Sequence, residues 1–466
     1  MANSRKPKPG KSVSADLVSR VTRQLQDVIK PGERLVIGLS GGIDSMVLLD
    51  ILSRIAKRRR FALAALHVNH QISHNAGRWA AFCRRECRAR GIPVRVVRVK
   101  VAGGDSLEAA ARTARYQAFR SRKADCIVLA HNQDDQAETL LLQLFRGAGV
   151  KGLAGMPRLR KEEGGRGGTE EGWKNSSTHF PCILRPLLGV TRTEIEAYAG
   201  RRKLEWVEDE SNFDTYFARN FVRREILPLI AKRYPSCRAT LARSADHFAE
   251  AAQLLDELAA HDSLICSSGG VLQVAGLRRL SRARAKNLLR YFLAERGVTM
   301  PNADRLEEAL RQSLTASDDA KVCVDLGGHE LRRFAGGLHI VRKTGSPGRR
   351  FSRSWRGGRE LALPELNGRL KMMKCPGSGI SLARLRAKPV TVRARAGGER
   401  LQPDCRRPRR SLKNLLQELR VPPWLRGRLP LLFSGDDLVW VPGIGIACEF
   451  QAAAGETAIT PEWVPD

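Results

Sequence analysis

The sequence predicts an α/β protein whose N-terminal part is a doubly wound parallel sheet. Short apolar runs near residues 35, 61, 94 and 126 have the length of buried strands. Segments with apolar residues at helical spacing separate these runs, and this alternation is typical of a parallel sheet with helices on both faces. Polar residues stand where the runs end, which is the edge at which open parallel sheets bind ligands.

The first elements contain the clearest local motif. An apolar helical stripe precedes the first strand at Leu35–Leu39, and the turn Ser40–Ser45 leads into a helix that we expect to begin at Asp44. Gly41 and Gly42 permit positive φ angles and a close backbone approach, and the helix start adds partial positive charge. The turn therefore predicts a phosphate site. It has neither the Walker A nor the GxGxxG spacing, and a plain glycine turn with Asp44 as a helix cap is the alternative.

The later strands bring further polar groups to the same edge. The second strand, Phe61–His70, ends in polar residues, and a third strand is expected at Val94–Val101. The helix that follows is opened by a capping box at Asp105–Glu108 and carries two arginines. The fourth strand, Cys126–Ala130, leads into a polar helix start at His131–Thr139. These groups predict one polar crevice beside the phosphate loop, although each of them has an ordinary reading as a strand end or a helix cap.

Length, charge and cysteine content limit the class of protein. A chain of 466 residues exceeds one ordinary core and predicts several domains. The formal charge of +33 favours a polyanionic partner, with nucleic acid ahead of a membrane surface, and a basic source proteome would account for part of the excess. No apolar run has the length of a membrane span, and no CxxC occurs among the 10 cysteines, which argues against zinc-ribbon and iron–sulfur sites. We expect a cytoplasmic protein.

The motifs together resemble a known family. The loop Ser40–Ser45 resembles the SGGxDS loop of the PP-loop ATP pyrophosphatases. A wider set of motifs, dense in the first half of the chain and resuming near residue 398, resembles the tRNA(Ile)-lysidine synthetases. The residues that carry the second resemblance are Ser40–Ser45, His67–His70, Ala111-Arg112, Arg115-Tyr116, His131–Thr139, Arg185–Leu188, Trp206–Asp209, Ser211-Asn212, Arg219–Arg223, Ile226–Pro228, Gly398–Arg400, Ser411–Lys413, Val421–Trp424 and Leu429–Leu431.

Three features depart from the family pattern. Asn132 stands where the family commonly has a second histidine, so that position can form hydrogen bonds but carries no charge. The polar, glycine-rich stretch 158–179 is interpreted as a longer surface loop, and 240–389 matches the family only loosely.

The resemblance implies a Rossmann-like catalytic domain and a two-step ligation. ATP adenylates O2 of the wobble cytidine in an isoleucine tRNA with a CAU anticodon, and the ε-amine of free L-lysine then displaces AMP. The implied cofactors are ATP and Mg²⁺. A different PP-loop tRNA modifier, such as a thiolation enzyme, and a non-catalytic RNA-binding protein with a degenerate nucleotide fold are the other hypotheses.

Each candidate residue has an expected role under that resemblance. The expected catalytic residues are Asp44, Arg112, Asp134 and Glu138, with Asp44 and Asp134 as metal ligands and with Asp134 and Glu138 alternatively facing the lysine ammonium. The expected nucleotide-binding residues are Ser40, Gly41, Gly42, Ile43, Asp44, Ser45, His67, Asn69, His70 and His131. The expected RNA-binding residues are Arg115, Arg219, Arg223, Arg406, Arg407, Arg409, Arg410 and Lys413. Within the Arg219–Arg223 segment, the Arg-Asn pair is expected to reach toward either the tRNA or the active site, and a solvated helix face is an equal alternative.

Five segments are expected along the chain. A flexible basic tail at 1–14, for which a transit peptide is the alternative, precedes a catalytic domain at 15–232. A mainly helical tRNA-binding domain at 233–345 is followed by a linker at 346–389, rich in Pro, Gly and Arg near its start. A small α+β domain at 390–466 carries the Arg406–Arg410 cluster and is expected to position the acceptor arm of the tRNA.

Overall fold

The computed structural model describes residues 13–71, 73–99, 107–120, 124–161, 181–208, 210–317, 320–343 and 351–465. They form two compact units, an N-terminal unit over Met1–Leu264 with Ala294–Gly297 and a C-terminal unit over Ile265–Leu293 with Val298–Asp466. Among the described helices, none has both the length and the apolar content needed to cross a membrane.

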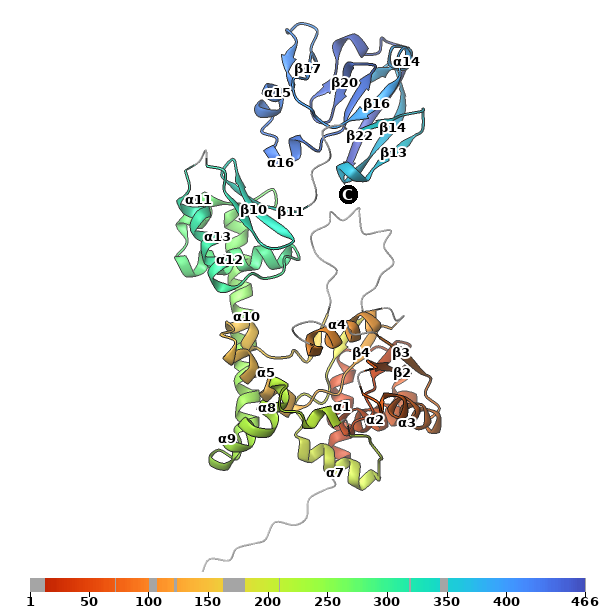
Figure 1. Cartoon of the computed structure of the whole chain (residues 1–466), viewed down its shortest axis with the longest axis vertical. Coiled ribbons are helices and arrows are strands. Elements are labelled where there is room, and N and C mark those ends of the chain that lie inside the picture. The colour runs from red at the N-terminus through yellow and green to blue at the C-terminus, as the bar shows by residue number, and fades with distance from the viewer. Residues whose placement is uncertain are drawn as a thin grey trace, which may run out of the picture. The chain divides into compact units, whose positions relative to one another are not determined.

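The N-terminal unit is built on a six-stranded sheet with the order β3-β2-β1-β4-β6-β5, of which β2, β3 and β4 are labelled in Figure 1. All neighbouring strands are parallel except β5, which runs antiparallel to β6. The strands are β1 (Arg34–Gly38), β2 (Ala62–Asn69), β3 (Val94–Arg98), β4 (Cys126–Val128), β5 (Leu159–Arg160) and β6 (Cys182–Leu184). The strand order reverses between β1 and β4, and open α/β sheets bind ligands at such a switch point.

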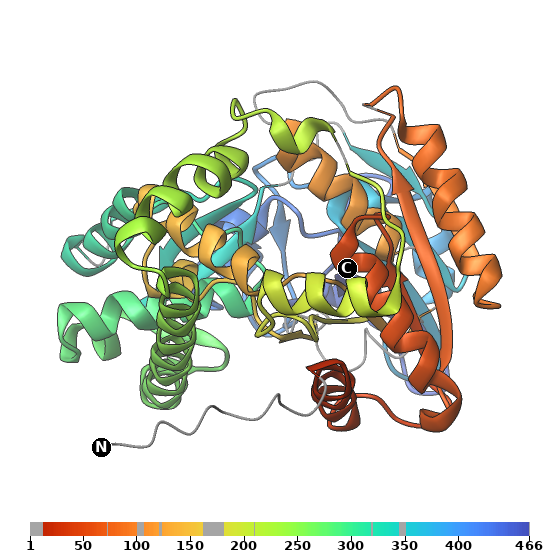
Figure 2. The same cartoon turned by 90° about the horizontal axis from the view of Figure 1, so that it is seen from below.

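Helices cover both faces of this sheet. Leu35 and Ile37 of β1 lie in one apolar cluster, whereas Val36 between them lies in another, because successive strand side chains point to opposite faces. Helices α1, α2, α3 and α7 contribute to the first cluster and α4 to the second, and the view in Figure 2 brings α1 and α7 to the front. The predicted doubly wound sheet is confirmed. The helical elements are α1 (Val13–Gln26), α2 (Ile43–Arg59), α3 (Ala76–Ala89), α4 (Leu107–Arg120), α5 (Gln133–Phe145), α6 (Val150–Leu153), α7 (Arg192–Arg202), η1 (Glu210–Phe213), α8 (Ala218–Phe221), the π-helical turn η2 (Val222–Ile226), α9 (Leu227–Arg233) and α10 (Cys237–Cys266).

Two predicted mobile segments fall largely outside the described residues. Of the expected tail at 1–14, only Val13 and Ser14 are described, and they form the start of α1. Of the expected loop at 158–179, residues 159–160 form β5, while residues 162–179 lie outside the described part of the chain.

The first part of the C-terminal unit combines helices with a five-stranded sheet of order β7-β8-β11-β10-β9. Its apolar core includes Leu288, Leu293 and Leu310 from helices and Leu331 and Leu338 from strands. The elements are β7 (Ser267–Ser268), β8 (Val271–Gln273), α11 (Val274–Arg279), α12 (Arg282–Glu295), α13 (Ala303–Thr315), β9 (Cys323–Asp325), β10 (His329–Phe334) and β11 (Gly337–Arg342).

The last part of the chain forms two further sheets, with orders β12-β16-β19-β20-β21 and β13-β14-β22-β15, and the ribbon β17-β18. Its elements are β12 (Ser352–Ser354), β13 (Glu360–Leu363), η3 (Pro364–Leu366), β14 (Gly368–Pro376), β15 (Ile380–Ser381), α14 (Leu382–Arg386), β16 (Val390–Arg393), β17 (Arg400–Leu401), β18 (Arg410–Ser411), α15 (Leu412–Glu418), α16 (Pro423–Arg426), β19 (Leu431–Ser434), β20 (Asp437–Val441), β21 (Gly445–Ile446), η4 (Cys448–Phe450) and β22 (Thr457–Pro465).

The expected linker at 346–389 differs from the structure. Residues 351–389 contain four strands, and β14 pairs with β22 from Gly368↔Pro465 to Pro376↔Thr457. Leu370 and Met372 of β14 are buried in the core, because alternate residues of the strand face inward. Arginine, glycine and proline residues interrupt these short strands in the sequence. The alternation of apolar and polar residues that is typical of a strand is therefore visible only when the buried face is known.

Candidate functional site

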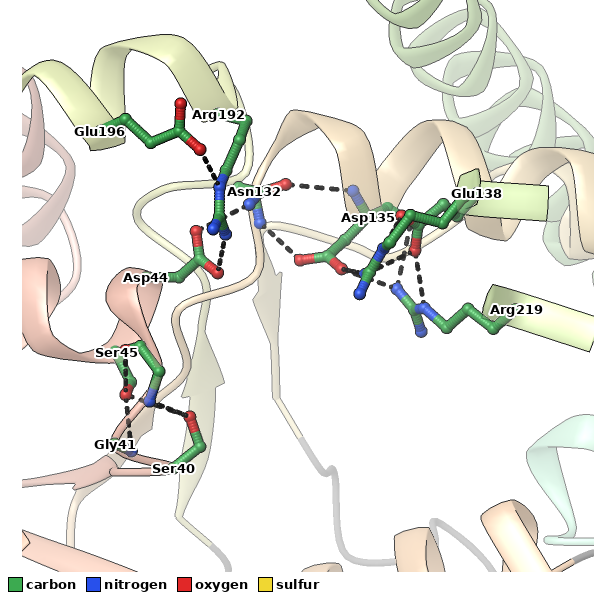
Figure 3. Close-up of polar contacts among 12 residues, drawn as sticks. Ser40, Gly41, Asp44, Ser45, Asn132, Asp135, Glu138, Arg192, Glu196 and Arg219 are labelled. Carbon is green, nitrogen blue, oxygen red and sulfur yellow. Dashed lines mark hydrogen bonds and ion pairs between the residues drawn. The ribbon is translucent and has the colours of Figure 1, made fainter. Parts of the chain in front are cut away.

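The loop between β1 and α2 is held by its own side chains. Ser45 Oγ accepts a hydrogen bond from Gly41 N at 3.1 Å and donates one to Gly42 O at 2.8 Å (Figure 3). Ser40 Oγ accepts from Gly42 N at 3.3 Å and contacts Ser45 Oγ at 3.1 Å. Gly42 is the N-cap of α2 and supplies no capping side chain, so the positive end of a 17-residue helix opens beside exposed Ser40. This is the geometry that binds anions.

Gly41 is fixed by two independent constraints. Its φ of +92° lies in the left-handed region, where a side chain is strained. A Cβ atom there would lie 2.8 Å from Cγ2 of Val207 and 3.2 Å from Sγ of Cys83. Val207 N also donates to Gly41 O at 3.0 Å, which keeps the backbone from moving away. The loop conformation therefore requires glycine at this position.

Asp44, in the first turn of α2, is held between two groups from other elements. Arg192 Nη1, from α7, lies 2.9 Å from Asp44 Oδ2, and Asn132 Nδ2 donates to Oδ1 at 2.9 Å. Burial raises the pKa of Asp44, while Arg192 and Asn132 counter that rise by stabilising the carboxylate. Arg192 is oriented by a 2.8 Å contact between its Nε and Glu196 Oε1. Arg192 is not among the site residues that the sequence predicts.

Asn132 joins the start of α5 to Asp44. It is the N-cap of α5, and its Oδ1 accepts from Asp135 N at 3.1 Å while Asp135 Oδ2 accepts from Asn132 N at 3.0 Å. This capping box consumes the amide oxygen and leaves Nδ2 for Asp44. The residue that departs from the family pattern thus forms hydrogen bonds with residues of both α2 and α5.

Two arginines bind the carboxylates on the next turn of α5. Arg219 Nε lies 2.8 Å from Glu138 Oε2, and Arg223 Nε lies 2.6 Å from Glu138 Oε1. Both guanidinium groups also reach Asp135 Oδ1, at 2.9 Å from Arg219 and 3.2 Å from Arg223. Glu138 is fully buried. Burial alone would raise the pKa of Asp135, but the charges of Arg219, His131 and Arg223 hold it below its ordinary value.

This arrangement differs from the expected use of α5. Asp134 does not share the environment of Glu138, because its Oδ2 pairs with Arg238 Nε at 2.8 Å. The carboxylate whose charge acts on Asp44 is Asp135, which lies within the predicted motif but is not among the predicted catalytic residues. Two features of the sequence could have identified Asp135. It lies three residues before Glu138, and it completes an Asn-x-x-Asp capping pattern with Asn132. Arg219 and Arg223 do not form a solvated face, because both contact the acids of α5, which agrees with the alternative that this segment reaches toward the active site. Their contact with RNA stays a prediction.

The other residues expected at the nucleotide lie elsewhere along the same sheet: His67, Asn69 and His70 at the end of β2, and His131 just before α5. His67 Nδ1 lies 2.9 Å from Leu39 O, and burial lowers the pKa of His67. Asn69 Nδ2 donates to Ala76 O at 3.2 Å, and its Oδ1 accepts from Gln71 N at 2.8 Å. These bonds shape the end of β2. Burial and the charge of Arg115 lower the pKa of His70 to about 4, which keeps it neutral near pH 7.

The structure gives only partial information on the two arginines of α4 and on the expected metal site. Arg115 is an exposed residue of α4, and Arg112 belongs to the same helix but its side chain lies outside the described part of the structure. In the described residues, no group of three or more His, Cys, Asp or Glu side chains could hold a metal ion. Magnesium commonly takes one or two carboxylates and completes its shell with water and substrate phosphates, so Asp44 beside the loop fits that mode.

The predicted basic cluster lies in the C-terminal unit. Arg406, Arg407 and Arg409 are exposed between β17 and β18, and Lys413 is exposed on α15. Arg410 is bound to the carboxylate of Glu418. Cys405, next to this cluster, forms a disulfide with Cys448, a pair that the sequence spacing did not indicate.

Family models and known relatives together match almost the entire chain. The PP-loop domain model matches residues 15–230, the TilS substrate binding domain model matches 272–339 and the TilS substrate C-terminal domain model matches 390–463. The tRNA(Ile)-lysidine synthase of Nitrosomonas europaea is 44% identical over 458 residues, which is 98% of this chain and 97% of the relative. The enzyme of the same name from Pseudomonas aeruginosa is 43% identical over 429 residues, covering 88% and 89%. That from Coxiella burnetii is 38% identical over 424 residues, covering 90% of each.

Proposed function

Because this chain belongs to the tRNA(Ile)-lysidine synthase family, we propose that it joins lysine to C2 of the wobble cytidine of an isoleucine tRNA with a CAU anticodon. The observation that supports this most is the series of contacts from Asp44, a residue of the phosphate loop, through Asn132 to Asp135 and from there through Arg219 to Glu138. A phosphate-binding loop and a charged amino-acid site are the two halves that such a ligation needs.

ATP is assigned to the loop end of this path. The helix start at Gly42 and the hydroxyls of Ser40 and Ser45 would bind the leaving pyrophosphate. Asp44 would hold Mg²⁺ together with the phosphates, and the metal would supply charge neutralisation there. Cytidine O2 attacks the α-phosphorus and the bond to pyrophosphate breaks. Because Arg192 contacts Asp44, it would keep that carboxylate ionised and oriented in spite of its burial.

Lysine is assigned to the α5 end. A bound amino acid needs carboxylates for its ammonium groups and a cation for its carboxylate. We assign the ammonium side to an acid of α5. The sequence predicts Asp134 and Glu138, which lie in different environments, and the contacts of Asp135 with the two arginines of Glu138 add it as a third candidate. Arg219, within reach of both Asp135 and Glu138, supplies the cation. The lysine ε-amine attacks C2 of the cytidine, and AMP leaves with the electrons of the C2–O bond.

The comparisons favour ligation over the other two hypotheses. Relatives named for lysidine synthesis span both units, whereas a thiolation enzyme typically carries reactive cysteine pairs, and this chain has no CxxC. The high coverage of these enzymes also disfavours a non-catalytic RNA-binding role. The cytoplasm remains the proposed location, because ATP and uncharged tRNA are both present there.

One incubation tests the proposed function directly. A CAU isoleucine tRNA transcript with ATP, Mg²⁺ and labelled lysine should gain label in the RNA, with one AMP and one pyrophosphate released for each lysine incorporated. The same tRNA with guanosine at the wobble position is the control and should gain none. Label in both transcripts, or AMP release without incorporated lysine, would contradict the proposal.

The two neighbouring acids of α5 can be separated by substitution. Asp134→Ala is expected to abolish lysine transfer if the sequence-based assignment holds, while Asp135→Ala is expected to do so if the contacts with Arg219 and Arg223 mark the lysine site. Initial rates at several lysine concentrations, with circular dichroism to check the fold, distinguish the two. Near-normal turnover in one variant removes that residue from the site.

The C-terminal basic cluster is expected to bind phosphates of the tRNA backbone. The double variant Arg406→Ala/Arg409→Ala should weaken tRNA binding and reduce the salt slope by about 1 for each phosphate that the variant no longer neutralises. Lys371→Ala/Lys374→Ala removes the same charge from the same unit and is the control. Filter binding at several salt concentrations measures both. An equal weakening in the two variants would show that only net charge matters.

A further inference from the structure

Two large aromatic side chains next to the candidate site are left in solvent. Phe213, at the end of η1, is 57% exposed, and Tyr216 is 90% exposed. Aromatic residues make up only 6% of this chain, and the apolar clusters of the N-terminal unit do not include these two rings. Their exposure costs hydrophobic stabilisation, so the core does not explain their positions.

Their neighbours are positively charged or aromatic. The guanidinium carbon of Arg224 lies 4.0 Å from the ring centroid of Phe213, which is a cation–π contact. The rings of Tyr216 and Phe217 meet edge to face, with centroids 6.0 Å apart and an angle of 82° between their planes. Aromatic rings and guanidinium planes are the surfaces on which proteins stack unpaired RNA bases.

Hydrogen bonds fix this segment to the charged residues of α5. Asn220 Nδ2 donates to Asp214 O at 2.9 Å, and Asp214 Oδ1 accepts from Tyr216 N at 2.9 Å. Asn220 is adjacent to Arg219, which contacts both Glu138 and Asp135. The backbone of the aromatic segment is therefore connected through Asn220 and Arg219 of α8 to the acids of the site.

We propose that Phe213, Tyr216 and Arg224 form a stacking surface for unpaired RNA bases that flank the base being modified. The inference rests on the proposed function, because that function places an anticodon loop at the neighbouring acids. A chain with a formal charge of +33 favours RNA over a protein partner for this surface, and Arg224 provides a cation beside the ring for the backbone. The surface contributes binding and orientation and takes no part in bond making.

The test compares aromatic with aliphatic side chains at these exposed positions. Phe213→Leu/Tyr216→Leu keeps apolar volume but removes both π-faces, and the affinity for an anticodon stem-loop should fall roughly 5- to 100-fold for each base that no longer stacks. Tyr234→Leu, which replaces another exposed aromatic residue of the same unit, is the matched control and should bind normally. Filter binding without ATP or lysine measures affinity independently of catalysis.

A second series locates the contact on the RNA. Stem-loops that lack a base on either side of the modified position should bind the full-length wild-type chain more weakly, whereas the double leucine variant should no longer distinguish them from the intact RNA. Equal binding by the double variant and the wild type would overturn the inference, and so would an equal loss of affinity in Tyr234→Leu. If RNA binding were unchanged and the surface bound a protein instead, the surface would be a protein-binding site and the inference would be wrong.

Lysidine formation, measured in parallel, separates this inference from the proposed function. Normal product formation with unchanged RNA affinity in the double variant would contradict only the stacking surface. Base-dependent RNA binding by the wild type without any lysidine product would contradict only the proposed ligation.

Discussion

Gly41→Ala is expected to lower ATP-dependent turnover by at least about 100-fold, because a displacement near 1 Å at a reacting centre has that effect. The new Cβ would lie 2.8 Å from Cγ2 of Val207, which is partly buried and hydrogen-bonded to Gly41 through its backbone, and 3.2 Å from Sγ of buried Cys83, so the backbone must move. That movement breaks the bonds which Ser45 Oγ makes to Gly41 and Gly42 and misplaces the amides at the start of α2. Pyrophosphate release on addition of tRNA and lysine measures the loss.

Gly32→Ala is the matched control for this change. Gly32 has a nearly equal φ of +90°, but its added Cβ would find no atom within 4 Å among the described residues. Both variants should lose about 1–3 kcal/mol of stability from backbone strain, and only Gly41→Ala should lose activity. Equal activity losses would mean that strain, and not the position of the phosphate loop, limits the enzyme.

Glu138→Gln is expected to lower the free energy of unfolding of the N-terminal unit by about 3–5 kcal/mol, which is the usual cost of removing one partner from a buried ion pair. Glu138 is fully buried between Arg219 and Arg223, and the neutral amide leaves those two charges with Asp135 as their remaining acid. Hydrogen exchange of the amides of α5 and α8 measures the loss locally, so unfolding of the other unit does not obscure it.

Glu205→Gln supplies the comparison for Glu138→Gln. Glu205 also pairs with an arginine, at 2.6 Å from Arg85 Nη2, but its side chain is largely exposed, and exposed pairs contribute little. Exchange in that variant should match the wild type. If Glu138→Gln matched it as well, while the KM for lysine rose, the carboxylate would serve the substrate and not the fold.

The parallel sheet and the phosphate loop were predictable because both are encoded locally. Apolar runs of strand length, glycines in one turn and a helical stripe after it are each visible within about 20 residues. The sequence predicts that α2 begins at Asp44, whereas in the structure it begins at Ile43. The difference arises because the N-cap is Gly42, which has no side chain to mark the helix start.

The electrostatic partners were not predictable from the same information. Arg192 lies 148 residues from Asp44, and Arg219 lies 81 from Glu138, so no periodicity links them. The choice of Asp134 over Asp135 followed from a spacing of four, whereas the capping box at Asn132 turns Asp135 toward the arginines. Each arginine could form an ion pair with any of many Asp and Glu residues, and only the folded structure determines which of them is close enough.

The position of β22 constrains how the C-terminal sheet is made. In the order β13-β14-β22-β15, the segment Thr457–Pro465 lies between two strands that precede it by many residues. A ribosome releases β14 and β15 long before β22, so during translation both present open backbone edges that only the late segment can fill. Chaperone dependence and sensitivity to ribosome stalling are therefore expected to concentrate in this sheet, while the N-terminal nucleotide fold is already complete.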